Sequence, residues 1–150
     1  MLLHILATDS DWVPTLARIV LGIIFFAHGA QKVFGWFGGP GLRKTVRHLT
    51  EFLGLPPIMA LAAAGAEFVG GLALILGFLG RMSALSIVVN MLAAIFMVHE
   101  KYGLFMNWFG DRKGHGIEYH LLAIALAIVI FAKGSDAFSL DGLLSSWIGA

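Results

Sequence analysis

The chain has 150 residues, of which 59% are hydrophobic and 13% are charged. Soluble globular domains are usually closer to half apolar and a quarter charged, so this composition favours a membrane protein. There is no cysteine, which excludes disulfide scaffolds, thiol relays and Cys-ligated zinc or iron–sulfur sites within the chain. The net charge of +1 is not gathered into a basic run, so nucleic-acid binding is not expected. The length fits a single domain over residues 1–150.

The first predicted element is a membrane-spanning helix over residues 13–34. The hydrocarbon core requires roughly 20 mostly apolar residues in a helix, and this stretch meets that requirement. The residues before it carry two aspartates and no Lys or Arg, unlike a signal peptide, so we expect the helix to be retained. Arg18, near the start of this span, is expected to snorkel outward or to pair with Asp136 or Asp141.

The loop over residues 35–55 is predicted to contain a short amphipathic helix. Apolar residues recur there at helical spacing, with basic residues between them: Leu42, Val46, Leu49 and Leu53 alternate with Arg43, Lys44, Arg47 and His48. Such a helix can lie at the membrane interface or can pack as a solvated cap on the end of the bundle. The sequence leaves both interpretations open.

Three further stretches are predicted to span the membrane: residues 58–79, 82–98 and 117–132. Pro57 suits a helix start, and Gly80 with Arg81 predicts a tight hairpin between the second and third spans. Gly134 follows the last span like a helix C-cap. No element is predicted in the mixed tail that follows. The expected fold is therefore all-α, an integral membrane four-helix bundle with an interfacial helix in the first loop.

Four spans place both termini on one side of the membrane and the two long loops on the other. The loop side carries most of the basic residues, which are Lys32, Arg43, Lys44, Arg47, Lys101, Arg112 and Lys113. The positive-inside rule then predicts cytoplasmic loops and outward-facing termini. Aromatic residues of the third loop, such as Trp108 and Phe109, are expected to anchor it at the headgroups.

Ionisable residues approach the loop side of all four predicted spans: His28, Glu67, His99, Glu118 and His120. Such groups are costly within a membrane, so each one deserves a functional hypothesis. Small residues flank Glu67, which predicts a tightly packed, inward-facing carboxyl and makes it the candidate proton acceptor. Glu118 and His120 are two residues apart and should point to roughly opposite sides of their helix.

Three kinds of site are compatible with this cluster. A metal or haem site would use His28, His99 and His120 as nitrogen ligands, with Glu67 as an oxygen ligand, although no tight ligand motif is present. A quinone pocket would use a histidine and a carboxylate as proton partners of the quinone oxygens. A proton or solute relay would use the same groups without redox chemistry. The plainer alternative is that the groups only hydrogen-bond between helices.

Several motifs of the chain resemble those of the DoxX family of bacterial membrane proteins: Arg18-Ile-Val-Leu-Gly22, His28-Gly-Ala-Gln-Lys32-Val-Phe-Gly35, Glu67-Phe-Val-Gly70-Gly71, Gly116-Ile-Glu118 and Ser139-Leu-Asp141. They touch all four predicted spans. Residues 101–114 show no family motif, so no loop contact is carried over. The resemblance implies a four-helix bundle in the bacterial inner membrane and a role as a redox or oxidative-stress membrane subunit.

The leading hypothesis is therefore a small membrane subunit of a redox assembly that handles quinone or protons. Glu67 and His28 would carry the chemistry, and four residues would line the site: Lys32, His99, Glu118 and His120. The alternatives are a scaffold that recruits a soluble enzyme through its basic loops, a haem- or metal-binding protein, and a small proton-coupled transporter. Expected partners are the lipid bilayer and other redox subunits, with oligomers compatible and nucleic acid not expected.

Overall fold

The computed structural model describes residues 12–135 and 138–148, and these are mostly helical, with no strand among them. The elements are α2 (Trp12–Phe34), η1 (Trp36–Gly38), α3 (Leu42–Leu53), α4 (Pro57–Leu76), α5 (Gly80–Ala94), the π-helical turn η2 (Ile95–His99), η3 (Glu100–Tyr102), α6 (Glu118–Lys133) and α7 (Leu140–Ile148). The all-α prediction is confirmed. The prediction that the residues before the first span are not a signal peptide concerns residues 1–11, which lie outside the described part.

The helix boundaries follow the proline and glycine signals of the sequence. Pro57 occupies the first turn of α4, where its missing N–H costs nothing. Gly77 ends α4 in the left-handed conformation (φ 65°), and the Gly134 N–H closes α6 on the Ile130 carbonyl. The second span therefore ends three residues before the predicted boundary at Leu79.

Three helical stretches are long and apolar enough to cross a membrane: Trp12–Phe34, Pro57–Leu76 and Gly80–Tyr102. The predicted fourth crossing is shorter than the others. Helix α6 has 16 residues, about 24 Å at 1.5 Å per residue, against a hydrocarbon core of about 30 Å. Three candidate spans are thus present within the described residues.

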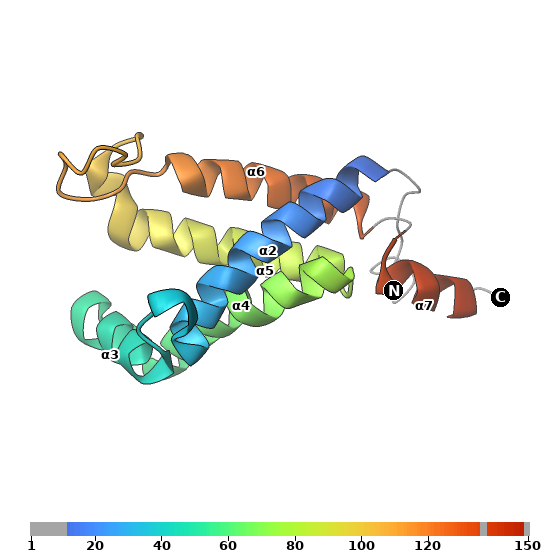
Figure 1. Ribbon diagram of the computed structural model, residues 1–150, viewed down its shortest axis with the longest axis horizontal. Coiled ribbons are helices and arrows are strands. Elements are labelled where there is room, and N and C mark those ends of the chain that lie inside the picture. The colour runs from blue at the N-terminus through green and yellow to red at the C-terminus, as the bar shows by residue number, and fades with distance from the viewer. Residues whose placement is uncertain (1–11, 136–137, 149–150) are drawn as a thin grey trace.

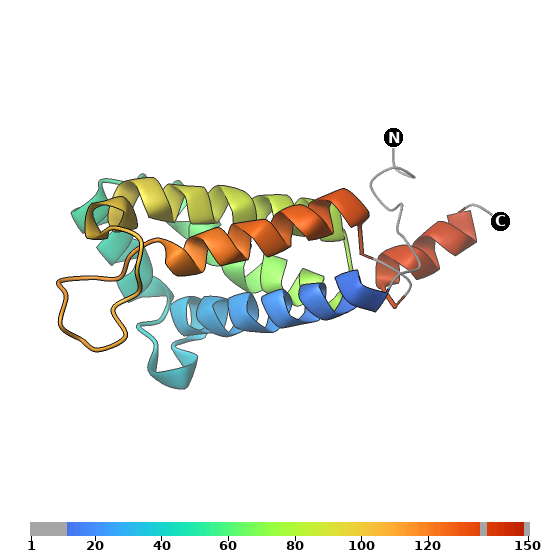
Figure 2. The ribbon, with the colours of Figure 1, turned by 90° about the horizontal axis from the view of Figure 1, so that it is seen from above.

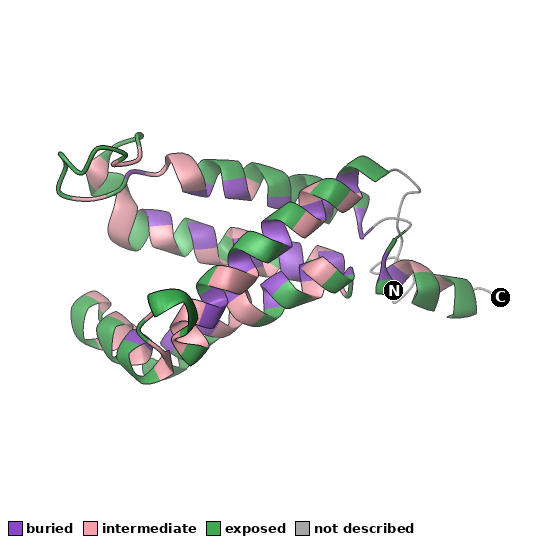
Figure 3. Ribbon diagram, in the orientation of Figure 1, coloured by how far each residue is buried: buried purple, intermediate pink, exposed green. Residues whose placement is uncertain are grey.

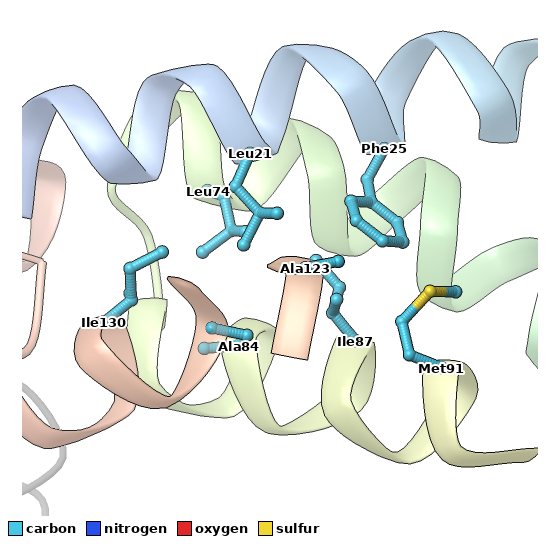
Figure 4. Packing of buried hydrophobic residues seen from close by; sticks show 9 residues of the cluster. Leu21, Phe25, Leu74, Ala84, Ile87, Met91, Ala123 and Ile130 are labelled. Atoms are coloured by element: carbon cyan, nitrogen blue, oxygen red, sulfur yellow. The ribbon is translucent and has the colours of Figure 1, made fainter. Parts of the chain in front are cut away.

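Helices α2, α4, α5 and α6 lie side by side, with α2 against α4 and α6, and α5 against α6 and α4 (Figures 1 and 2). The core between them is built from Leu21, Phe25, Leu74, Ala84, Ile87, Met91, Ala123, Ala127 and Ile130 (Figure 4). The outward faces of the helices are apolar and exposed, as in Val69, Val89 and Leu122 (Figure 3). Such a surface is suited to lipid rather than to water.

The backbones of α2 and α4 lie especially close because each helix presents a glycine to the backbone of the other. A Cβ added at Gly29 would collide with the backbone nitrogen of Phe68, and one at Gly71 with that of Phe26. Small residues of this kind let membrane helices approach without side chains between them. The close approach sets the distance between the two helices beside Lys32 and Glu67.

Helix α3 lies at the same end as the loop over residues 103–117, and α7 lies at the opposite end (Figures 1 and 2). The predicted helix of the first loop is present, and it packs against α4 and α2. Thr45, its buried residue, donates a hydrogen bond to the Lys32 carbonyl (3.2 Å). Its basic residues are exposed.

Arg18 does not snorkel, and that expectation is wrong. Its side chain is 1% exposed, and the guanidinium donates to the carbonyls of Leu74, Ile75 (2.8 Å) and Phe138 (2.8 Å). The last carbonyls of a helix have no partner within it, and the C-terminal turn of α4 therefore holds the cation inside the protein.

The tail contains α7, a helix that the sequence pattern does not predict. The Asp141 carboxylate at its start accepts hydrogen bonds from the backbone N–H of Leu79 (2.7 Å) and Gly80 (2.9 Å) and from the Ser135 hydroxyl (2.5 Å). It thereby caps the N-terminus of α5 from outside that helix. Asp136, the other proposed partner of Arg18, lies outside the described residues.

Candidate functional site

The centre of the candidate site is the Glu67 carboxylate, which joins three helices. Its Oε1 accepts a hydrogen bond from Lys32 Nζ of α2 (2.5 Å) and another from Asn90 Nδ2 of α5 (2.9 Å). The Glu67 side chain is 5% exposed and that of Lys32 is 37% exposed. A buried carboxylate is tolerated when a cation neutralises its charge and a second donor hydrogen-bonds to it. Lys32 is the cation here, and Asn90 is the second donor.

The second oxygen of Glu67 faces a different environment. Three buried atoms, Glu67 Oε2, Tyr119 Oη and His120 Nδ1, have no hydrogen-bond partner among the described residues. All three residues line one cavity of about 240 Å³ at the loop-side end of the bundle. Buried polar groups are almost always satisfied, and such a concentration of unsatisfied atoms is typical of a place that receives water or a polar ligand.

His99 and His120 form the loop-side wall of this cavity. Their ring centroids are 4.2 Å apart, with a 43° angle between the ring planes. The π-helical turn η2 ends at His99 and shifts the register of α5 there, a feature that often accompanies functional sites. His99 Nδ1 donates to the His115 carbonyl (2.8 Å), which leaves Nε2 as the basic nitrogen of a neutral ring.

His28 lies at the edge of the same cavity and is exposed. Its ring centroid is 6.1 Å from that of Tyr119, and the Tyr119 ring stands in turn 6.4 Å from Phe25. The cavity therefore has an aromatic inner wall and a histidine-rich outer one. The structure gathers five of the six predicted site residues around this cavity: His28, Lys32, Glu67, His99 and His120.

Glu118 is the predicted residue that lies elsewhere. Its Oε2 accepts a hydrogen bond from the Met106 backbone N–H (3.0 Å), and it lines a separate cavity beside Leu121. The two-residue offset from His120 directs the two side chains to different sides of α6. Glu118 therefore holds the third loop against the start of α6.

Asn90 and Tyr119 belong to the site and were not among its predicted residues. Asn90 is a polar side chain within a predicted span, and polar residues at such positions often indicate a functional site. Tyr119 lies next to His120 and carries no comparable signal, because aromatic residues at span ends usually serve as anchors. Within the described residues, no group of three His, Cys, Asp or Glu side chains is placed to hold a metal ion.

Two known proteins are similar to this chain over most of its length. The chain is 30% identical over 130 residues to "Inner membrane protein YqjF" of Escherichia coli (strain K12), covering 87% of this chain and 90% of that protein. It is 29% identical over 126 residues to "Putative oxidoreductase CatD" of Bacillus subtilis (strain 168), covering 84% and 82%. No solved structure matches the chain. Residues 13–100 match the family model described as DoxX, and this chain therefore belongs to the DoxX family of membrane proteins.

Proposed function

We propose that this protein is a small membrane subunit of a redox assembly and exchanges protons with a quinone at the Glu67 cavity. The observation that carries the proposal is the set of unsatisfied buried atoms on Glu67, Tyr119 and His120, three residues that line one cavity. The name of the Bacillus subtilis relative, which includes the word oxidoreductase, is consistent with it.

The cavity chemistry suits a quinone ring. A Tyr hydroxyl and a His N–H can donate to a quinone oxygen, and a carboxylate can take up or deliver the proton. A quinone accepts two electrons and two protons to give a hydroquinone. The electrons would come from a partner redox subunit, since the chain has no cysteine for an iron–sulfur or thiol relay. The protons would pass through Glu67 and the histidines.

The size of the cavity also favours a small polar group. Its volume of about 240 Å³ lies below the roughly 300–1,000 Å³ of most ligand pockets. It suits a quinone ring, whose tail would extend outside, or a few water molecules. A haem would need more room, and a metal would need a tighter ligand set.

We also propose the placement of the protein in the bacterial inner membrane. Helices α2, α4 and α5 cross it, and α6 completes a four-helix bundle, with its shorter length offset by local thinning of the bilayer. Helix α3 lies at the loop-side surface, and the charge bias predicts that this side is cytoplasmic. The whole chain, residues 1–150, is taken as one domain.

The proposal is tested by quinone binding to the purified protein. Wild-type protein in mild detergent should bind a short-tailed ubiquinone analogue in calorimetric titrations. Glu67→Gln should weaken binding of the reduced, hydroquinone form of this analogue about tenfold, because the hydroquinone O–H then loses a charged acceptor, worth roughly 1.4 kcal/mol or more. Glu100→Gln, an exposed carboxylate at the same end, is the matched control and should bind as wild type. Equal binding by wild type and Glu67→Gln would refute the assignment.

A second candidate function is a scaffold that recruits a soluble redox enzyme. Trp108 and Phe109 in the third loop are 76% and 93% exposed, and the basic residues Arg43, Lys44 and Arg47 of α3 are exposed at the same end. Under this alternative, reversing the charges on α3 would abolish function in cells while Glu67→Gln would not. The quinone proposal predicts the opposite result.

A further inference from the structure

A larger cavity, distinct from the Glu67 cavity, lies at the loop-side end, outside the bundle. It has a volume of about 510 Å³ and is formed by the end of α2, the turn at Pro40 and residues of α3. This volume lies within the roughly 300–1,000 Å³ typical of ligand sites. The Glu67 centre does not use it, although Lys32 forms part of the wall of both cavities.

The polar wall of this cavity carries more positive than negative charge. Lys44 and Arg47 contribute full positive charges, and Glu51 is the one carboxylate among the lining residues. Lys32 is already neutralised by Glu67. Neither Lys44 nor Arg47 makes an ion pair with any described residue. The cavity can therefore accept a phosphate-sized anion without breaking an existing contact of these two side chains.

Part of the wall is apolar. Leu49 and Phe52 line it, and Phe52 is 74% exposed although it is a large aromatic residue. The His48 ring stands 4.9 Å from the Phe52 ring and extends this surface. A free anion would not contact this apolar surface favourably. An amphiphile would bury the surface under its hydrocarbon part and gain free energy from that burial.

From this pairing of cations with an exposed apolar wall, we propose that the cavity binds the headgroup of an anionic phospholipid. Lys44 and Arg47 contact the phosphate, and Phe52 contacts the start of an acyl chain. The location agrees with this ligand, because α3 packs on the ends of two membrane-crossing helices, α2 and α4. Basic side chains of amphipathic helices at that depth meet the headgroup layer.

The test is a competition assay on the full-length protein in detergent micelles, with a fluorescent phosphatidylglycerol as the bound probe. Phosphatidylglycerol should compete at least tenfold better than phosphatidylcholine. Lys44→Gln/Arg47→Gln should weaken its binding about 30-fold, the loss expected for two basic side chains near an anionic surface. The matched control Lys101→Gln/Lys113→Gln removes two exposed charges from the other loop-side segment and should bind as wild type.

Further arms separate the sources of the anion. Phe52→Ser should weaken phosphatidylglycerol but should leave inorganic phosphate unaffected. If phosphate competes as well as the lipid and Phe52→Ser changes nothing, the cavity takes a free anion and the lipid assignment is wrong. If phosphatidylethanolamine competes equally, Glu51 is recognising its ammonium and the anionic selectivity is refuted. Equal losses in both double variants would also overturn the site, because the effect would then be general electrostatics.

Discussion

The two oxygens of the Glu67 carboxylate differ in their hydrogen bonding. Oε1 is held by Lys32 and Asn90, while Oε2 is buried and has no partner among the described residues. The first oxygen fixes the position of the carboxylate, and the second remains available to a ligand or a proton. This division is the reason for proposing that Glu67 exchanges a proton rather than serving packing alone.

The Lys32–Glu67 pair should show strong energetic coupling. Lys32→Met leaves the carboxylate with only Asn90, and we expect the free energy of unfolding to fall by about 1.5–3 kcal/mol, as for a hydrogen bond to a charged group. Adding Glu67→Gln should recover part of this loss, because the buried charge is then gone. Unfolding titrations of the two single variants and the double variant measure the coupling. Strictly additive losses would show that the contact contributes nothing.

Residue chemistry also marks the limit of what the sequence can predict about the site. Glu67 could be found because a carboxyl inside a span is costly, and His120 because it opens the last span. Lys32 was expected near the site, but its bond to Glu67 depends on the closeness of α2 and α4, which no local pattern encodes. Tyr119 was missed because its inward orientation is set by the rotation of α6 against α2, which no local pattern encodes either.

At the element scale, the α2–α4 contact positions the site. Gly71 lies against the backbone of Phe26, so a side chain there must push the helices apart. We expect Gly71→Ala to push α2 and α4 apart one turn from Glu67, to weaken the Lys32–Glu67 contact and to lower thermal stability. The measurement is the Tm of purified protein together with quinone binding.

Gly65 on the same helix is the matched control. A Cβ at Gly65 meets nothing within 4 Å, so Gly65→Ala should be neutral or should stabilise the helix by up to about 1 kcal/mol through propensity alone. If both substitutions lower the Tm equally, the close contact does not determine stability and helix propensity or folding in detergent dominates instead.

Capping at the opposite end holds α7 to the bundle. Asp141→Ala removes the acceptor for the Leu79 and Gly80 N–H groups and should cost about 0.5–2 kcal/mol of unfolding free energy, as the loss of an N-cap does. Ser146→Ala on the exposed side of α7 should have little effect. Quinone binding should stay unchanged in both variants, because this end is remote from the cavity. A loss of binding in Asp141→Ala would connect the two ends.

The elements themselves were largely predictable, and the exceptions have physical causes. Apolar runs bounded by Pro57, Gly80 and Gly134 predicted helices to within a few residues. Helix α7 was missed because its start is stabilised by Asp141 bonding to α5, a contact between distant parts of the chain. The buried state of Arg18 was missed because the acceptors are carbonyls at the end of α4, which a sequence does not display.

At the scale of the whole molecule, charge and polarity are divided between two ends. The loop-side end carries the Glu67 cavity, the cavity beside α3 and the basic residues of α3, while the other end carries the Arg18 and Asp141 contacts. The orientation that we propose, with the loop side in the cytoplasm, rests on this asymmetry. It would give the Glu67 cavity protons from the cytoplasm.

The absence of cysteine from the sequence makes this orientation easy to measure. In intact cells, Lys113→Cys should resist a membrane-impermeant maleimide, whereas Ser146→Cys should react, because the first lies in the loop and the second on α7. Both should react after the cells are broken open. Labelling of Lys113→Cys in intact cells would reverse the orientation.

The proposed proton exchange by Glu67 is tested most directly by infrared difference spectroscopy of the quinone-loaded protein during electrochemical reduction. If Glu67 exchanges a proton with the quinone, wild type and Glu100→Gln will show a carboxyl C=O difference band that exchanges with D₂O and is lost in Glu67→Gln. The same band in all three proteins, or no carboxyl band while the quinone is reduced in the site, would contradict the role assigned to Glu67.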